Sequence, residues 1–129
     1  SKSYDNYIGI FDDKKILKKQ IMAIVTDDTP LEASKNPDKC NVFALMKFFT
    51  SPERLDTIAQ KYRAWGYGYG HAKLELLEML LEYFSCAREK YNHYMSDYSL
   101  VEKQLEKWNK KASEIHDKKY SELKNIVGL

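Results

Sequence analysis

The sequence has 129 residues, which is enough for one domain with a hydrophobic core. Its 21 basic and 19 acidic residues leave a net charge of +2, too small to indicate a nucleic-acid partner from charge alone. No apolar run approaches the roughly 18 residues of a membrane-spanning helix, and the first residues lack the features of a signal peptide. Cys40 and Cys86 match no metal-binding spacing, so we expect two free thiols in a cytoplasmic protein.

Residues 1–11 predict a polar loop followed by a short strand, with apolar residues at Tyr7, Ile8, Ile10 and Phe11. No second clear strand is present to pair with it, and an unpaired strand is not stable by itself. The sequence also begins without methionine. We therefore expect the chain to be cut from a longer protein, with a neighbouring domain missing.

Residues 12–24 predict an amphipathic helix that Asp12 or Asp13 can cap, with Leu17, Ile21 and Ile24 on its inner side. The other side is basic and carries two pairs at i,i+4 spacing: Lys14, Lys15, Lys18 and Lys19. A basic helix face can bind a phosphate backbone, but such a run is more often only a solvated face. The sequence leaves both interpretations open.

Residues 26–39 form a polar stretch without periodicity, which we expect either to carry function or to lie against a partner surface. Asn41 can cap a short, buried helix over residues 42–50. Ser51 and Pro52 then predict the start of a helix that runs to Trp65. Its inner face is predicted from apolar residues at helical spacing: Leu55, Ile58, Ala59, Tyr62 and Trp65.

The most unusual stretch is the run from Trp65 to Lys73, in which Gly66, Gly68 and Gly70 alternate with two tyrosines. Glycine accepts positive φ at little cost, so these residues can end one helix and turn the chain into the next. A plain corner needs about one glycine rather than three. The surplus suggests a specific function, and the tyrosines are expected either to pack under the turn or to be held out for stacking.

Residues 71–95 predict one long helix with two apolar stripes, sandwiched between other helices. Arg88 falls on one of these stripes, so its charge needs a partner or an exit to water. Ser96 and Asp97 predict a cap, and residues 98–127 a second long helix that Gly128 ends. Its predicted bundle seam is Val101, Leu105, Trp108, Ala112 and Ile115. The whole is predicted to be an all-α helical bundle.

No complete active site is evident within the chain. None of the three histidines has a second histidine or a carboxylate at zinc-binding spacing, so no metal site is expected. Cys86 and His93 lie about two turns apart on one helix, too far to act as a pair. Aromatic side chains beside cations are the arrangement that holds unstacked RNA bases, although aromatics more often pack inside. The RNA-binding candidates are Arg63, Tyr67, Tyr69, Lys73, Lys107 and Lys111.

Several blocks together resemble bacterial tryptophanyl-tRNA synthetases. Residues 1–3, Ser-Lys-Ser, resemble the end of the KMSKS signature of class I synthetases. Residues 23–30 and 36–45 are similar to the segment that follows the signature in this family. The glycine-tyrosine-glycine run at 66–68, with Lys73, resembles its conserved corner, and residues 128–129 its usual ending. The resemblance covers essentially the whole chain.

This resemblance implies a function for a longer parent enzyme. The family activates tryptophan with ATP and Mg, transfers it to tRNA(Trp), and acts as a cytoplasmic homodimer. Lys2 would correspond to the signature's second lysine, a catalytic residue that can meet charge on the leaving pyrophosphate. Ser1 and Ser3 would take part in ATP binding beside it.

The resemblance also predicts the domain organisation. Residues 1–11 would be the end of the KMSKS loop and a linking strand of a missing Rossmann domain, and residues 12–129 a helical anticodon-binding domain. The isolated chain is then expected to bind no ATP and to be catalytically inactive. The alternative is a stand-alone helical protein- or RNA-interaction module in which the matching blocks are accidental.

Overall fold

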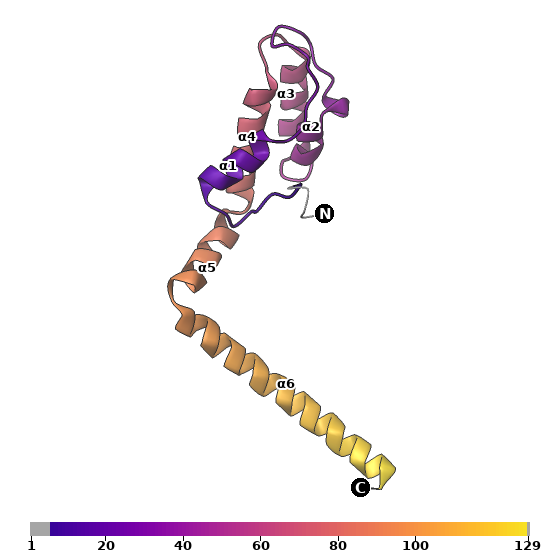
Figure 1. Ribbon diagram of the computed structural model, residues 1–129. Helices are drawn as coiled ribbons and strands as arrows, with labels where there is room; N and C mark the ends of the chain where they lie inside the picture. The colour runs from indigo at the N-terminus through magenta and orange to yellow at the C-terminus, as the bar shows by residue number, and fades with distance from the viewer. Residues whose placement is uncertain (1–5, 129) are drawn as a thin grey trace. The chain divides into compact units, whose positions relative to one another are not determined.

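The structure is a computed structural model that describes residues 6–128 (Figure 1). All regular elements in this range are helical, which confirms the all-α prediction. They are α1 (Lys14–Met22), the 3-10 turn η2 (Pro37–Lys39), α2 (Asn41–Met46), α3 (Pro52–Arg63), α4 (Tyr69–Tyr83), α5 (Ser85–Ser96) and α6 (Tyr98–Val127). The chain divides into two units, Ser1–Arg88 and Glu89–Leu129, and the boundary falls within α5.

The prediction of a strand near residues 7–11 is wrong, because the backbone N–H and C=O groups of this segment form hydrogen bonds of other kinds. Asp12 closes a turn by donating its N–H to the carbonyl of Gly9 at 2.8 Å. The N–H of Gly9 donates to Oε1 of Gln20 at 2.9 Å. The guanidinium of Arg88 donates to the carbonyl oxygens of Ile10 and Asp12. These bonds supply the partner that the charge of Arg88 was expected to need.

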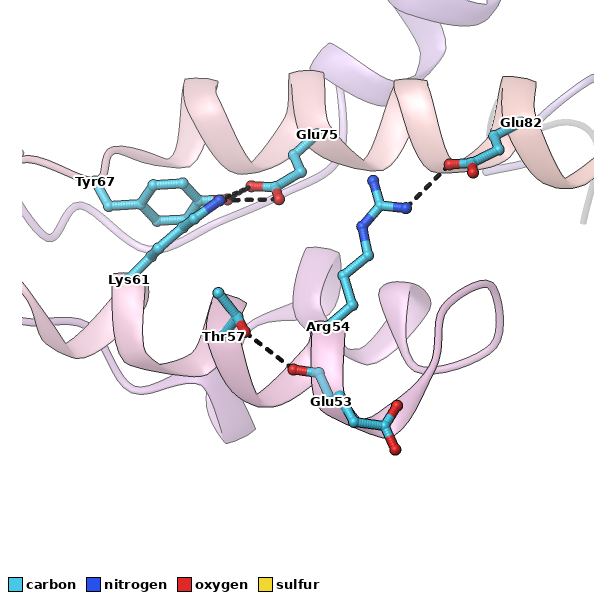
Figure 2. Close-up of polar contacts among 7 residues, drawn as sticks. All are labelled: Glu53, Arg54, Thr57, Lys61, Tyr67, Glu75 and Glu82. Atoms are coloured by element: carbon cyan, nitrogen blue, oxygen red, sulfur yellow. Dashed lines mark hydrogen bonds and ion pairs between the residues drawn. The ribbon is translucent and has the colours of Figure 1, made fainter.

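The core of the first unit lies between α1, α2, α3 and α4, with α1 and α2 both packed on α4. Arg54 of α3 pairs with Glu82 of α4, and Lys61 of α3 pairs with Glu75 of α4, so the two helices run antiparallel (Figure 2). The fully buried large side chains are Leu17, Ile21, Val42, Met46, Ile58, Tyr62, Leu76 and Met79. Each of the four helices therefore contributes two of these side chains, about one turn apart, to one hydrophobic cluster.

The helix starts agree only in part with the sequence. Ser51 caps α3 as predicted, since its Oγ accepts the N–H of Arg54 at 3.4 Å. The prediction that Asn41 caps the preceding helix, α2, is wrong. Asn41 is the first residue of α2, and its side chain donates instead to the carbonyl of Val25 at 3.1 Å. That helix is also shorter than expected and ends at Met46.

One buried lysine orders the polar loop at 26–39. Lys35 is only 3% exposed, and its Nζ donates to the carbonyl oxygens of Pro30 at 2.7 Å and Ala33 at 3.0 Å. Its backbone N–H donates to the carbonyl of Tyr62, next to the end of α3, at 2.8 Å. The loop thus folds around an ammonium group that satisfies its carbonyls, and it is held against the end of α3.

The single helix predicted over residues 71–95 is divided at Phe84 into α4 and α5. The ring of Phe84 packs against those of Phe49, at 5.8 Å, and Tyr83, at 5.0 Å. Ser85, a residue type that favours helix starts, is the first residue of α5. The apolar spacing continues through this break, so the sequence pattern gives no sign of it.

In the second unit, α6 has the predicted bounds. Asp97 caps its start by accepting the N–H of Ser99 at 3.0 Å, and Gly128 ends it with φ of 76°. No residue of α6 is buried, and its seam residues Leu105, Trp108 and Ile115 are 48%, 59% and 58% exposed. The seam is therefore not covered within this unit.

Candidate nucleic-acid interface at the glycine corner

The glycine corner, residues 64–70, comprises the connection between α3 and α4 and the first two residues of α4. Gly66 has φ of 79°, a left-handed conformation that favours glycine. A Cβ on Gly68 would lie 2.9 Å from the end of the Leu31 side chain, so a larger residue there would require that side chain to shift. Gly70 has neither a positive φ nor a close neighbour, since nothing lies within 4 Å of a Cβ placed there. Two of the three glycines therefore have a structural reason.

His71 acts as a cap at the start of α4. The N–H of Gly68 donates to its Nδ1 at 3.3 Å. Its ring lies beside that of Tyr67, with centroids 6.2 Å apart.

Tyr67 is half-buried and holds the corner to α4. Its hydroxyl donates to Glu75 at 2.7 Å, and the Nζ of Lys61 donates to the same carboxylate at 3.1 Å (Figure 2). Burial, followed by the bond to Glu75, raises the pKa of Tyr67. Its ring packs on Tyr62, with centroids 5.2 Å apart. The hydroxyl of Tyr67 is thus engaged within the fold.

Tyr69 holds the polar loop to α4. Its hydroxyl donates to Oδ1 of Asp27 at 2.7 Å, and the N–H of Thr29 donates to the same oxygen at 2.9 Å. Burial and the bond to Asp27 raise the pKa of Tyr69 to about 12. Hydrogen bonds from Thr29 and Tyr69 lower the pKa of Asp27. The Nζ of Lys35 lies 5.5 Å from the centre of the Tyr69 ring.

Both corner tyrosines pack around Tyr62, a fully buried aromatic residue of α3. The ring centroids of Tyr62 and Tyr69 are 6.3 Å apart, and Phe43 of α2 lies 5.4 Å away on another side. The Tyr62 hydroxyl lies 3.4 Å from the Cys40 sulfur. Of the two arrangements that the sequence left open for the corner tyrosines, the structure shows the packed one.

The remaining candidates lie in different places. Lys73 donates its Nζ to the carbonyl of Met22 at 3.0 Å, so it completes the end of α1. Arg63 is exposed at the end of α3. Lys107 and Lys111 are exposed on α6, in the second unit. The structure thus brings Arg63, Tyr67, Tyr69 and Lys73 into one unit and places the two α6 lysines in the other.

Trp65 is a candidate that the sequence prediction placed wrongly. It was expected on the inner face of a helix ending at residue 65, but it is 86% exposed. Because α3 ends at Arg63, Trp65 lies past the helix and no longer follows its apolar register. The signal was Gly66, since a glycine just after a helix usually marks its end. Arg63, two positions earlier in the sequence, is also exposed. An exposed indole and an exposed arginine are the kinds of side chain on which a nucleic-acid base can stack.

Comparison with known proteins identifies relatives along the entire chain, although no family model matches it. A tryptophan–tRNA ligase of Fusobacterium nucleatum is 45% identical over all 129 residues, which span 39% of that relative. A tryptophan–tRNA ligase of Campylobacter jejuni is 40% identical over the whole chain, which spans 40% of its length. The crystal structure of tryptophanyl-tRNA synthetase from Campylobacter jejuni with ADP and tryptophan superposes with a TM-score of 0.93, covering 100% of this chain and 40% of that one.

The chain is a homologue of the C-terminal part of bacterial tryptophan–tRNA ligases. It spans about 40% of the length of the ligases it matches. Sequence identity of 45% and 40% over alignments that cover the whole chain excludes the alternative in which the matching blocks are accidental.

The residues tied to the ligase signature, Ser1, Lys2 and Ser3, lie outside the described residues, and their roles stay predictions. Within residues 6–128, no three His, Cys, Asp or Glu side chains are grouped as metal ligands. No helix in this range is long and apolar enough to cross a membrane. Cys40 is buried and Cys86 is exposed, and the structure joins neither in a disulfide.

Proposed function

We propose that this chain supplies the tRNA-binding part of a tryptophan–tRNA ligase, an enzyme that activates tryptophan with ATP and transfers it to tRNA(Trp). The observation that carries the proposal is the match to ligases over the whole chain, in sequence and in fold. A structural relative was solved with ADP and tryptophan, which supports a nucleotide and tryptophan as ligands of the complete enzyme. Mg as the metal of the ATP complex, a homodimeric parent enzyme and a cytoplasmic location belong to the same proposal.

Within the chain, the base-reading role is assigned to the exposed end of the glycine corner. Arg63 and Trp65 offer a cation and an aromatic face to solvent. Tyr67, Tyr69 and Lys73 hold this end in place through Glu75, Asp27 and the end of α1. Lys107 and Lys111 stay candidates for phosphate contacts from the second unit.

The test is binding of the chain to a tRNA(Trp) transcript and to the same transcript with its anticodon changed. We expect tighter binding to the native anticodon. Trp65→Ala should weaken it about tenfold, as expected for loss of one stacked base. Phe48→Ala removes another aromatic residue that is 73% exposed and serves as the matched control. Equal binding of both transcripts by the wild type would contradict a base-reading role.

The catalytic part of the proposal has a separate test. The 129-residue chain, mixed with ATP, Mg and tryptophan, should give no exchange of labelled pyrophosphate into ATP. Exchange clearly above a blank would contradict the assignment of activation to the remainder of the parent enzyme.

A further inference from the structure

Helix α1 carries the most concentrated unpaired charge in the described part of the chain. Its nine residues include four lysines and no acidic residue: Lys14, Lys15, Lys18 and Lys19. All four are exposed, and none forms an ion pair with another residue in the range 6–128. These four side chains are called the α1 lysine face below.

The positive charge of the chain depends on this face. Of 21 basic residues in the sequence, 17 remain when the four lysines are set aside, beside 19 acidic ones. By contrast, α6 distributes seven lysines among five acidic residues over 30 positions. Two exposed lysines elsewhere, Lys47 and Lys119, pair with Asp38 and Glu122.

The arrangement does not serve the stability of the helix. Lys14 and Lys15 are the first two residues of α1, where positive charge opposes the helix dipole. Lys14 with Lys18, and Lys15 with Lys19, are like charges at i,i+4, each costing roughly 0.2–0.5 kcal/mol. Asp12 and Asp13 precede the helix, but the Asp12 carboxylate accepts the side chain of Gln20. An external anion would offset this repulsion.

The rest of the structure makes α1 a firm support for this face. Leu17 and Ile21 are each 1% exposed and pack in the core against α4. Gln20 bonds the N–H of Gly9, and Lys73 bonds the carbonyl of Met22. The exposed apolar residues of α1, Ile16 and Met22, are six positions apart and lie on different sides of the helix. The helix therefore has no continuous apolar face to insert into a membrane surface, as an amphipathic membrane helix would.

We propose that the α1 lysine face binds the phosphate backbone of RNA without regard to base sequence. The choice of RNA over an acidic protein rests on the proposed function, since the relatives are tRNA ligases. Lysine ammonium groups bind phosphates as point charges and carry no base specificity. The face would therefore add affinity for any folded RNA, whereas base selection would belong to the glycine corner.

The test compares two variants that remove the same charge. Lys15→Gln with Lys19→Gln removes half of the α1 lysine face, and Lys47→Gln with Lys119→Gln removes two lysines that already have carboxylate partners. Affinity is measured at several salt concentrations for the tRNA(Trp) transcript, its anticodon variant and an unrelated RNA hairpin. Far-UV circular dichroism checks folding, and Lys15→Arg with Lys19→Arg keeps the charge.

We expect the α1 double variant to bind all three RNAs about tenfold more weakly at low salt. The slope of log K against log salt should fall by about 1.5–2, as for two lost phosphate contacts. The arginine variant and the Lys47/Lys119 variant should keep the wild-type slope. An equal loss of affinity in the Lys47/Lys119 variant would show that the effect depends only on net charge, and it would overturn the proposal.

The outcomes separate this proposal from the proposed function. If the wild type prefers the native anticodon but the α1 variant binds with an unchanged slope, only the α1 proposal fails. If the wild type binds all RNAs equally and the α1 variant weakens each of them, the α1 proposal holds and the base-reading role fails. If the wild type binds no RNA, both are overturned.

Discussion

Lys35 is the only charged residue that is buried in the part of the chain that the structure describes. Its ammonium group is removed from water and supplies hydrogen bonds to carbonyls of the polar loop. A buried acceptor that loses its donor costs about 1–3 kcal/mol. Lys35→Met keeps most of the side-chain volume but removes the donor. We expect the free energy of unfolding in urea to fall by about 2–3 kcal/mol.

Lys39→Met is the matched control for this prediction, because Lys39 is an exposed lysine close by in the sequence. Its effect should stay within about 0.5 kcal/mol. Equal losses in the two variants would mean that the hydrogen bonds of Lys35 add nothing to the stability of the fold.

Asp27 makes part of the loop's stability depend on pH. Hydrogen bonds from Thr29 and Tyr69 lower its pKa below the ordinary 3.8. A carboxyl with a lowered folded-state pKa adds stability above its unfolded pKa and loses it as pH falls through the folded value. The difference in unfolding free energy between the wild type and Asp27→Asn should therefore be present at pH 7 and begin to shrink as pH falls below about 3.8. Thermal or urea unfolding across pH measures it.

Asp28→Asn is the control for the Asp27 measurement, since the bonds from Thr29 and Tyr69 go to Asp27 alone. The hydrogen-bonded hydroxyl of Tyr69 gives the opposite dependence of stability on pH in the alkaline range, because its pKa is raised to about 12. The stability that Tyr69 contributes to the fold should be lost as pH rises from 10 towards 12. A pH-independent difference for Asp27→Asn would contradict the acid part of this account.

At the scale of elements, Arg88 joins α5 to the segment before α1. Its guanidinium donates to the carbonyls of Ile10 and Asp12, two acceptors that lie outside any helix. Arg88→Gln cannot reach both acceptors. We expect amide exchange at Gly9 and Asp12, whose N–H groups bond within this segment, to accelerate about tenfold. Hydrogen exchange followed by NMR or mass spectrometry measures this effect.

Arg54→Gln provides the comparison for Arg88. Its partner, Glu82, has a side chain that is 71% exposed, and exposed ion pairs contribute little. Exchange at Gly9 and Asp12 should not change in this variant. Acceleration of the same size would show that the segment responds to general destabilisation rather than to the loss of the Arg88 bonds.

The success of sequence-based prediction also varied by element, for physical reasons. The α6 helix was predicted with its observed bounds because its spacing, Asp97 and Gly128 are all local signals. The break at Phe84 was missed because the packing of its ring on Phe49 is a tertiary contact that leaves the spacing unchanged. The strand was mispredicted because the Arg88 contact spans 76–78 positions in sequence.

The candidate site was predicted in position but not in detail. The glycine corner was located from its composition, which reports backbone conformation directly at Gly66. Which aromatic residues are exposed depended on where α3 ends and on the distant partners Glu75 and Asp27. Trp65 therefore replaced Tyr67 and Tyr69 as the exposed aromatic residue of the corner.

At the scale of the whole molecule, the two units differ in how their helices are stabilised. Helix α4 has five buried residues, whereas α6, with 30 residues, has none. A helix of this length can form by itself, but without packing its hydrogen bonds open readily. We expect the amides of α6 to exchange at least about 100-fold faster than the core amides of α4 under native conditions. Hydrogen exchange with mass spectrometry resolves the two helices.

The same measurement at two protein concentrations determines what a slower exchange would mean. Leu105, Trp108 and Ile115 are about half exposed, so association of copies through this seam would cover apolar surface and slow exchange as concentration rises. Slow exchange that does not depend on concentration would instead contradict the prediction, because α6 would then be protected without association of copies. Fast exchange at both concentrations would show that α6 depends on its own backbone hydrogen bonds, while the stability of the chain resides in the first unit.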